Sequence, residues 1–290
     1  MRKCNPLLLL ACLCCATIAL QGPARAQVYA VAPFTNPRLH RIDPATGAST
    51  LVAPLSDPNL GFAGIEFDQS GRLLGIDTAR VGGGGTRKLW QINTSTGAVT
   101  PLLDLQTGEV LFEGGFSVDP TTNLAYLVEQ SDFYQLDLVT GAFTSLGRLT
   151  FNGMPMDSGT NVDGLAFRGG DLYGIVTIQT PGLNGHLVRI DKNTRVVTDV
   201  GATGLTPGAV AGLTYDPGAD VFYLAGTNLP GLYRLSPQTG AATLIGNNAL
   251  SDVSGLAFQI PEPTYLAFAL PIVAPLLRRR RLGKDRRPRG

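Results

Sequence analysis

Four short strand patterns that recur five times in a fixed order between residues 27 and 260 predict an all-β fold. Within each pattern, apolar residues alternate with small or polar ones, which is the period of a half-buried β-strand. Successive repeats begin 43 to 51 residues apart. Four strands in a repeat of about 40 to 50 residues are typical of propeller blades. The sequence therefore predicts one five-bladed β-propeller with four-stranded blades over residues 27–260.

The first pattern of each repeat is a glycine followed by alternating apolar residues, and we expect it to form the innermost strand. Its members begin at Gly64, Gly115, Gly164, Gly212 and Gly255. The second pattern is a strand of leucine, valine and aromatic residues. It covers Val28–Val31, Leu73–Ile76, Leu124–Leu127, Leu172–Ile175 and Phe222–Ala225.

The third pattern ends in a polar residue that opens a turn, and a fourth strand follows the turn. The third strands cover Leu39–Asp43, Leu89–Asn93, Phe133–Asp137, Leu187–Asp191 and Leu232–Ser236. In the first repeat the turn reads Asp43-Pro44-Ala45-Thr46-Gly47. Asp caps such a turn, Pro fixes φ, and Gly accepts a positive φ. These residues predict the outer hairpin of each blade.

The ends of the repeat region indicate how the ring closes. The region begins with a second-pattern strand at Val28 and ends with a first-pattern strand at Gly255. We expect the last strand to complete the first blade and so remove the open sheet edge. The sequences of these strands resemble NHL-type and related extracellular propeller repeats over nearly the whole region. That resemblance implies a fold only, because propellers host many unrelated functions.

The N-terminus reads as a secretory signal peptide over residues 1–26. Two basic residues precede an apolar run, Leu7–Leu20, which leads to the small-x-small sequence Ala24-Arg25-Ala26. Cleavage is expected after Ala26, so that Gln27 begins the mature chain. A lipoprotein signal at Cys12 is the alternative, although apolar residues rather than polar ones follow that cysteine. All four cysteines lie in this segment, so the mature domain needs no disulfide.

The C-terminus, residues 261–290, has three parts in a fixed order. Pro261, Glu262 and Pro263 end the strand region, because proline cannot continue a sheet ladder. An apolar stretch, residues 264–277, comes next. As a helix its 14 residues would measure about 21 Å, short for a hydrocarbon core of about 30 Å. The third part is a basic cluster, Arg278, Arg279, Arg280 and Arg281. The positive-inside rule would hold this cluster in the cytoplasm.

These three parts resemble the PEP-CTERM sorting signal, which exosortases of exopolysaccharide-producing Gram-negative bacteria recognise and cut. The resemblance covers about 30 residues. It implies an exported chain that uses the secretion machinery, a short transmembrane helix that holds it transiently at the inner membrane, and cleavage that leaves it at the cell surface or outside. The nine residues after Arg281 are a departure, since such signals usually end soon after the arginines.

Processing would change the charge of the protein. The whole chain carries a formal charge of +1, but removing residues 1–26 and 264–290 takes away eleven of 23 basic residues and one of 22 acidic residues. The remaining domain would have about nine more acidic than basic groups. A domain of this charge is a poor match for nucleic acid, so no nucleic-acid partner is expected.

Three carboxylates stand out when the five repeats are aligned. Glu66 is the only charged residue at its position in the innermost strands, and Glu113 and Asp163 precede other innermost strands. They could form a calcium or glycan site, or a general acid and base, at the mouth of the channel. The alternative is that they are solvated rim residues. No cofactor is predicted, and calcium is kept as the one candidate ion.

The other candidates are two histidines and four aromatic residues, and for each of them a role without chemistry is the simpler interpretation. His40 and His186 belong to no nucleophile–base pair and no zinc motif, which indicates ordinary surface histidines. Phe62, Trp90, Phe112 and Phe151 are candidates for stacking on sugar rings, but most propeller aromatics pack between blades.

The sequence thus favours a non-catalytic binding or scaffold propeller, exported, sorted by an exosortase and associated with exopolysaccharide. The alternative is a propeller hydrolase or lactonase that uses the channel-mouth carboxylates.

Overall fold

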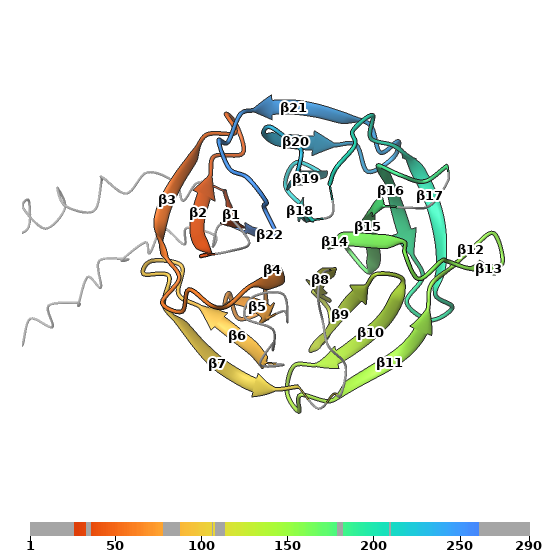
Figure 1. Ribbon diagram of the computed structural model, residues 1–290, viewed down its shortest axis with the longest axis horizontal. Coiled ribbons are helices and arrows are strands. Elements are labelled where there is room, and N and C mark those ends of the chain that lie inside the picture. Colours follow the sequence, from red (N-terminus) through yellow and green to blue (C-terminus); the bar gives the residue numbers. More distant parts are fainter. Residues whose placement is uncertain are drawn as a thin grey trace, which may run out of the picture. The chain divides into compact units, whose positions relative to one another are not determined.

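The computed structural model describes residues 26–32, 36–77, 88–105, 107, 114–178, 182–208 and 210–260. Over these residues the chain forms five β-sheets arranged as blades around a ring (Figure 1). The prediction of a five-bladed β-propeller is confirmed. Ala24, Pro261 to Pro263, the apolar stretch and Arg278 to Arg281 lie outside the described residues. Among the described residues, no helix has the length and apolar character needed to span a membrane.

Each blade has four strands that run in order from the innermost to the outermost. Blade 1 contains β22 (Gly255–Gln259), β1 (Gln27–Ala32), β2 (Arg38–Ile42) and β3 (Ser49–Pro54). Blade 2 contains β4 (Phe62–Phe67), β5 (Leu73–Asp77), β6 (Lys88–Ile92) and β7 (Val99–Asp104). Blade 3 contains β8 (Gly115–Val118), β9 (Leu124–Glu129), β10 (Asp132–Asp137) and β11 (Phe143–Arg148).

The last two blades follow the same order. Blade 4 contains β14 (Asn161–Arg168), β15 (Asp171–Ile178), β16 (His186–Ile190) and β17 (Val196–Ala202). Blade 5 contains β18 (Ala211–Asp216), β19 (Val221–Gly226), β20 (Leu232–Leu235) and β21 (Ala242–Gly246). We call the side of the ring where the innermost strands begin the loop face, and the side where they end the turn face.

The last strand closes the ring as predicted. β22 lies antiparallel to β1, in a register that pairs Gln27 with Gln259 at the turn face and Val31 with Gly255 toward the loop face. Blade 1 is therefore built from both ends of the described chain, and β1 is paired on both of its edges, by β22 and by β2.

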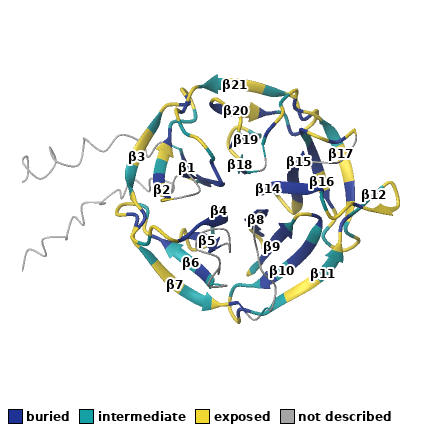
Figure 2. Cartoon of the chain, in the orientation of Figure 1, coloured by how far each residue is buried: buried dark blue, intermediate teal, exposed yellow. Residues whose placement is uncertain are grey.

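The hydrophobic core is divided into five clusters, one at each junction between neighbouring blades. Between blades 1 and 2, for example, Leu39 and Val31 pack with Phe62 and Ile65. Figure 2 shows the buried residues concentrated on the inner strands, while the outermost strands are mostly exposed or half-buried. Burial of one large apolar side chain contributes about 1.5–3 kcal/mol, so stability is spread around the whole ring.

Each innermost strand has a glycine at or near its start, and close contact with the next blade explains this residue. A Cβ on Gly64 would lie 2.9 Å from Cβ of Phe116 in blade 3, and one on Gly255 would lie 2.7 Å from the backbone nitrogen of Ile65 in blade 2. Gly115, Gly164 and Gly212 meet the next blade in the same way. The five innermost strands therefore approach one another too closely for a side chain at this level.

The outer hairpins have the predicted turn chemistry. The Asp43 carboxylate accepts a hydrogen bond from the Ala45 amide at 2.8 Å, and Gly47 has a φ of +73°. In blade 3, hydrogen bonds from the Thr140 and Val139 amides lower the pKa of Asp137. The turn of blade 4 differs, because Arg195 occupies the glycine position with a φ of +65°.

Blade 4 also carries a small hairpin that the repeat pattern does not predict. β12 (Thr150–Phe151) pairs in parallel with β17, and β13 (Met154–Pro155) pairs with β12. The sheet of blade 4 thus has six strands, and its outer edge is covered by the segment that leads into it from blade 3 (Figure 1).

Candidate functional site

Glu66 lies on β4, the innermost strand of blade 2, and points toward blade 3. Its carboxyl group accepts hydrogen bonds from the Phe67 amide at 3.0 Å and from the Ser117 hydroxyl of β8 at 3.3 Å. Burial raises the pKa of the Glu66 carboxyl to about 8, and the two hydrogen bonds offset only part of this effect. The side chain is half-buried, so this protonated acid keeps some contact with solvent.

Asp163 lies on β14, the innermost strand of blade 4, and is buried. One carboxylate oxygen accepts a hydrogen bond from the Thr177 hydroxyl of β15 at 2.5 Å. The contact lies within the same blade and directs that oxygen toward the second strand. A strand bulge between Asp163 and Leu165 accompanies this arrangement.

The structure places these two carboxyl groups at different levels of the ring. Gly64 and Gly164 occupy equivalent positions, so Asp163 precedes that level by one residue and Glu66 follows it by two. Three residues of strand correspond to about 10 Å along the channel. The hydrogen bonds of Glu66 to Ser117 and of Asp163 to Thr177 also reach different blades, so these bonds do not bring the two carboxyl groups together.

Glu113, the third predicted carboxylate, lies outside the described residues. Within the described ranges, no group of three or more His, Cys, Asp or Glu side chains is arranged to hold a metal ion. Calcium binding stays a prediction, because one of the three carboxylates proposed for it lies outside the described residues.

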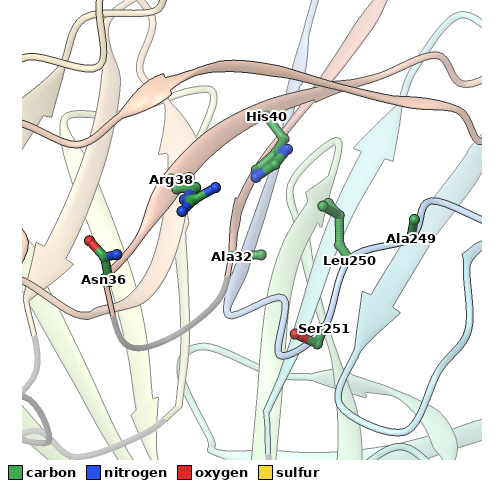
Figure 3. A pocket seen from close by; sticks show the side chains of 7 residues that line it. All are labelled: Ala32, Asn36, Arg38, His40, Ala249, Leu250 and Ser251. Carbon is green, nitrogen blue, oxygen red and sulfur yellow. The ribbon is translucent and has the colours of Figure 1, made fainter.

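A pocket of about 290 Å³ lies at the loop face, at the junction between blades 5 and 1. Figure 3 shows Arg38 and His40 of β2 on one side of it and the segment before β22 on the other. The pocket is lined by Ala32, Asn36, Arg38, His40, Ala249, Leu250 and Ser251.

His40 has a different environment from the one that its sequence context indicates. Its Nδ1 atom is buried and has no hydrogen-bond partner among the residues that the structure describes. Burial, and to a smaller extent the neighbouring Arg38, lower the pKa of His40. His186, in contrast, is satisfied, because its Nδ1 lies 2.9 Å from a carboxylate oxygen of Asp199.

A second difference between the blades indicates this pocket, although the comparison of carboxylates does not. It concerns the residues at the loop-face ends of the third and fourth strands. In blade 2, Lys88 pairs in register with Asp104, and in blade 3 Asp132 pairs with Arg148. The equivalent position in blade 1 places Arg38 opposite Pro54. Blades 4 and 5 place His186 opposite Ala202 and Leu232 opposite Gly246, so blade 1 alone has a charged residue without a charged partner at this register. The repeat alignment could have revealed this difference.

The aromatic candidates for sugar stacking are mainly part of the core. Phe62 is fully buried between blades 1 and 2, and Trp90 packs against the same cluster. Phe151 of β12 is half-buried against the core between blades 3 and 4. Phe112 lies outside the described residues.

Comparison with known proteins adds a fold and no family. No protein-family model matches the sequence, and no curated protein matches it. A structural genomics protein of unknown function from Bacteroides thetaiotaomicron aligns with a TM-score of 0.51 and 14% identity. That alignment covers 71% of this chain and 55% of the other, so this chain spans about half of that protein.

A chain of the nidogen/laminin complex also aligns, with a TM-score of 0.51 and 12% identity, over 81% of this chain and 82% of the other. At such low identity, structural likeness concerns the fold alone. The comparisons support the β-propeller assignment and say nothing about the ligand.

Proposed function

We propose that the protein is an exported propeller, sorted by an exosortase to the cell surface, where it binds or scaffolds exopolysaccharide without catalysis. The observation that carries this proposal is the match between the ring and its flanking signals. The first strand begins at Gln27, directly after the expected cleavage site at Ala26. The last strand ends at Gln259, two residues before Pro261. Both cuts would therefore spare every strand of the ring.

The described side chains support binding more than catalysis. Glu66 and Asp163 bond to different partners at different levels of the ring. The pocket beside His40 contains hydrogen-bonding groups and a cation, but neither a carboxylate nor a thiol among its lining residues. Such a set of groups can hold a polar ligand.

The proposal is tested by following the chain in a host that has an exosortase. Protein recovered from the envelope or the medium should begin near Gln27 and lack Arg278 to Arg281 by intact mass. Replacing these four arginines with glutamine should weaken retention and processing, because each arginine opposes transfer across the membrane. A mature pool that still ends at Gly290 would contradict sorting and leave a plain membrane anchor.

One observation favours the alternative of a hydrolase or lactonase. A carboxyl group with a pKa near 8, as Glu66 has, can donate a proton at neutral pH. A panel of glycosides and lactones, assayed with the wild type and with Glu66→Gln, tests this idea. Turnover that the substitution abolishes would establish catalysis, whereas absence of turnover over the panel would exclude these two classes of substrate.

Calcium binding is tested separately. A rise in Tm on addition of calcium that is absent from Glu66→Ala and Asp163→Ala would establish a site involving these residues. An unchanged Tm in millimolar calcium would count against it.

A further inference from the structure

The pocket at the loop face is formed where the chain closes on itself. β2 contributes Arg38 and His40, and the segment Ala249–Ser251 approaches from the opposite wall immediately before β22. Ala32, at the end of β1, belongs to the core cluster between blades 5 and 1, and Leu250 packs against that cluster. The pocket therefore combines apolar side chains, such as Ala32 and Leu250, with polar ones, such as Arg38 and His40.

The wall formed by residues 249–251 is fixed by local hydrogen bonds. The Asn247 side chain accepts a bond from the Ala249 amide at 2.8 Å, and the Asn248 side chain accepts one from the Leu250 amide at 3.0 Å. The Ser49 hydroxyl donates to the backbone oxygen of Asn248 at 2.5 Å. Ala249 has a φ of +54°, a conformation that alanine adopts only where its surroundings impose it. A wall held in this way is formed before any ligand arrives.

Arg38 supplies the positive charge of the pocket. It is exposed, and no carboxylate in the described part of the chain pairs with it, although Lys88 and Arg148 are paired at the corresponding register of blades 2 and 3. Arg38 and His40 are two residues apart on one strand and so share a face. An arginine fork binds a carboxylate through two parallel hydrogen bonds.

His40 supplies a second group with unused hydrogen-bonding capacity. Its Nδ1 is shielded from water and has no partner in the described part of the chain. An atom closed to water is closed to a ligand too, so contact with Nδ1 would require the imidazole to turn about its Cβ–Cγ bond. The bond then formed would remove the cost of the unpaired atom. Asn36 and Ser251 provide an amide and a hydroxyl at the same pocket.

We propose that this pocket binds the carboxylate of an acidic sugar residue, with Arg38 as the ionic partner and His40 as a hydrogen-bonding partner. The volume of about 290 Å³ is at the small end of the range of ligand pockets, which favours a single sugar ring over a larger ligand. Amide and hydroxyl groups can bond to sugar hydroxyls, while Leu250 offers contact to the apolar face of the ring. The choice of a sugar as the carrier of the carboxylate rests on the proposed function; the recognition of a carboxylate does not.

The experiment is calorimetric titration of the purified full chain, in detergent, with methyl glucuronide, methyl glucoside, acetate and inorganic phosphate. Methyl glucuronide should bind at least tenfold more tightly than the other three. Arg38→Gln should reduce its affinity about 10- to 100-fold, because a charge-assisted bidentate contact is lost. His40→Phe should reduce it less, by about tenfold, since one hydrogen bond is removed.

Arg41→Gln is the matched control. Arg41 lies on the same strand, faces the other side of the sheet, and its loss changes the net charge equally. Its affinity should equal that of the wild type. Circular dichroism and Tm confirm that each variant is folded.

Several outcomes would overturn the proposal. Equal binding of methyl glucoside, or unchanged affinity in Arg38→Gln, would show that the carboxylate is not recognised. Equal binding of acetate would retain carboxylate recognition but reject the sugar, and stronger binding of phosphate would reject both. The test of sorting follows residues 261–290 and not the pocket. A failed titration would therefore not decide the proposed function.

Discussion

Blades 1 and 4 differ in how the edge of a strand is covered by another strand. Blade 1 is assembled from the two ends of the described chain, and its inner strand β22 is held by the pairing with β1. Blade 4 is continuous in sequence and is extended at its outer edge by β12 and β13. The first device closes the ring, so every blade depends on it. The second covers one exposed edge, so its contribution is local.

Among the changes that test this comparison, removal of β22 should have the largest effect on stability. A chain that stops at Ser254 lacks the inner strand of blade 1 and exposes the buried residues of β1. We expect it to lose cooperative unfolding and to aggregate, because the ring stays open. Thermal unfolding followed by circular dichroism measures this.

A chain that stops at Ile260 is the control, and it should unfold like the full domain, since β22 is complete. If the two truncated chains unfold at the same temperature, the seam contributes nothing to folding.

Substitution of one of the five glycines at which the innermost strands approach one another should have the next largest effect on stability. Gly255→Ala would place a methyl group 2.7 Å from a backbone nitrogen of β4, and relief requires a shift of a whole strand. We expect a loss of about 1–3 kcal/mol, typical of overpacking. Denaturant titration measures the change in free energy of unfolding.

Gly170→Ala provides the contrast in blade 4. An added methyl group there meets no atom within 4 Å, so stability should stay within about 0.5 kcal/mol of the wild type or rise slightly. Equal losses at Gly255 and Gly170 would show that the innermost strands pack more loosely than these distances indicate.

The hairpin of blade 4 should matter less. Phe151→Ala removes a half-buried ring from the core between blades 3 and 4, and we expect a loss of about 1–2 kcal/mol. Met154→Ala, at a side chain that is 69% exposed, should change stability by less than about 0.5 kcal/mol. Hydrogen exchange should show the effect of Phe151→Ala confined to blades 3 and 4. Protection lost around the whole ring would mean that the hairpin is not a local device.

The smallest effect concerns Glu66 and depends on pH. Its folded pKa of about 8 lies above its ordinary value of 4.5, so the folded state holds more protons than the unfolded state between these values. The stability associated with this group is present below pH 4.5 and is lost as pH rises toward 8. Because the side chain keeps some contact with solvent, the change will be smaller than the pKa alone implies.

Glu66→Gln should therefore be less sensitive to pH than the wild type between pH 5 and 8. Tm measured across this range is the readout. Identical pH profiles would show that Glu66 ionises normally in the folded protein.

Much of this fold can be predicted from the sequence, because each strand carries its own alternation and each outer hairpin its own turn residues. The closure of blade 1 could be predicted as well, since the repeat is cut at Val28 and Gly255. The hairpin at Thr150 could not, because its two-residue strands are too short to show a period. Its pairing with β17 depends on the position of another blade.

The candidate site was harder to predict for a physical reason. Alignment of repeats identifies an unusual residue such as Glu66 or Asp163, but it does not give the direction of a side chain or its partners. The Asp163 carboxyl group bonds to Thr177, fourteen residues away, within its own blade. The Arg38 pocket needs residues more than 200 positions apart in sequence, which only closure of the ring brings together.

The pairing of β22 with β1 also determines how the domain would carry a mechanical load. The pocket lies at the loop face, whereas Gln259 pairs with Gln27 at the turn face. A pull between a ligand held by Arg38 and the chain leaving at Ile260 would run along β22, across its hydrogen bonds to β1. Strands loaded in this direction must break several bonds at once. Tension between residues 27 and 260 would instead open the same ladder one pair at a time, starting at the turn face.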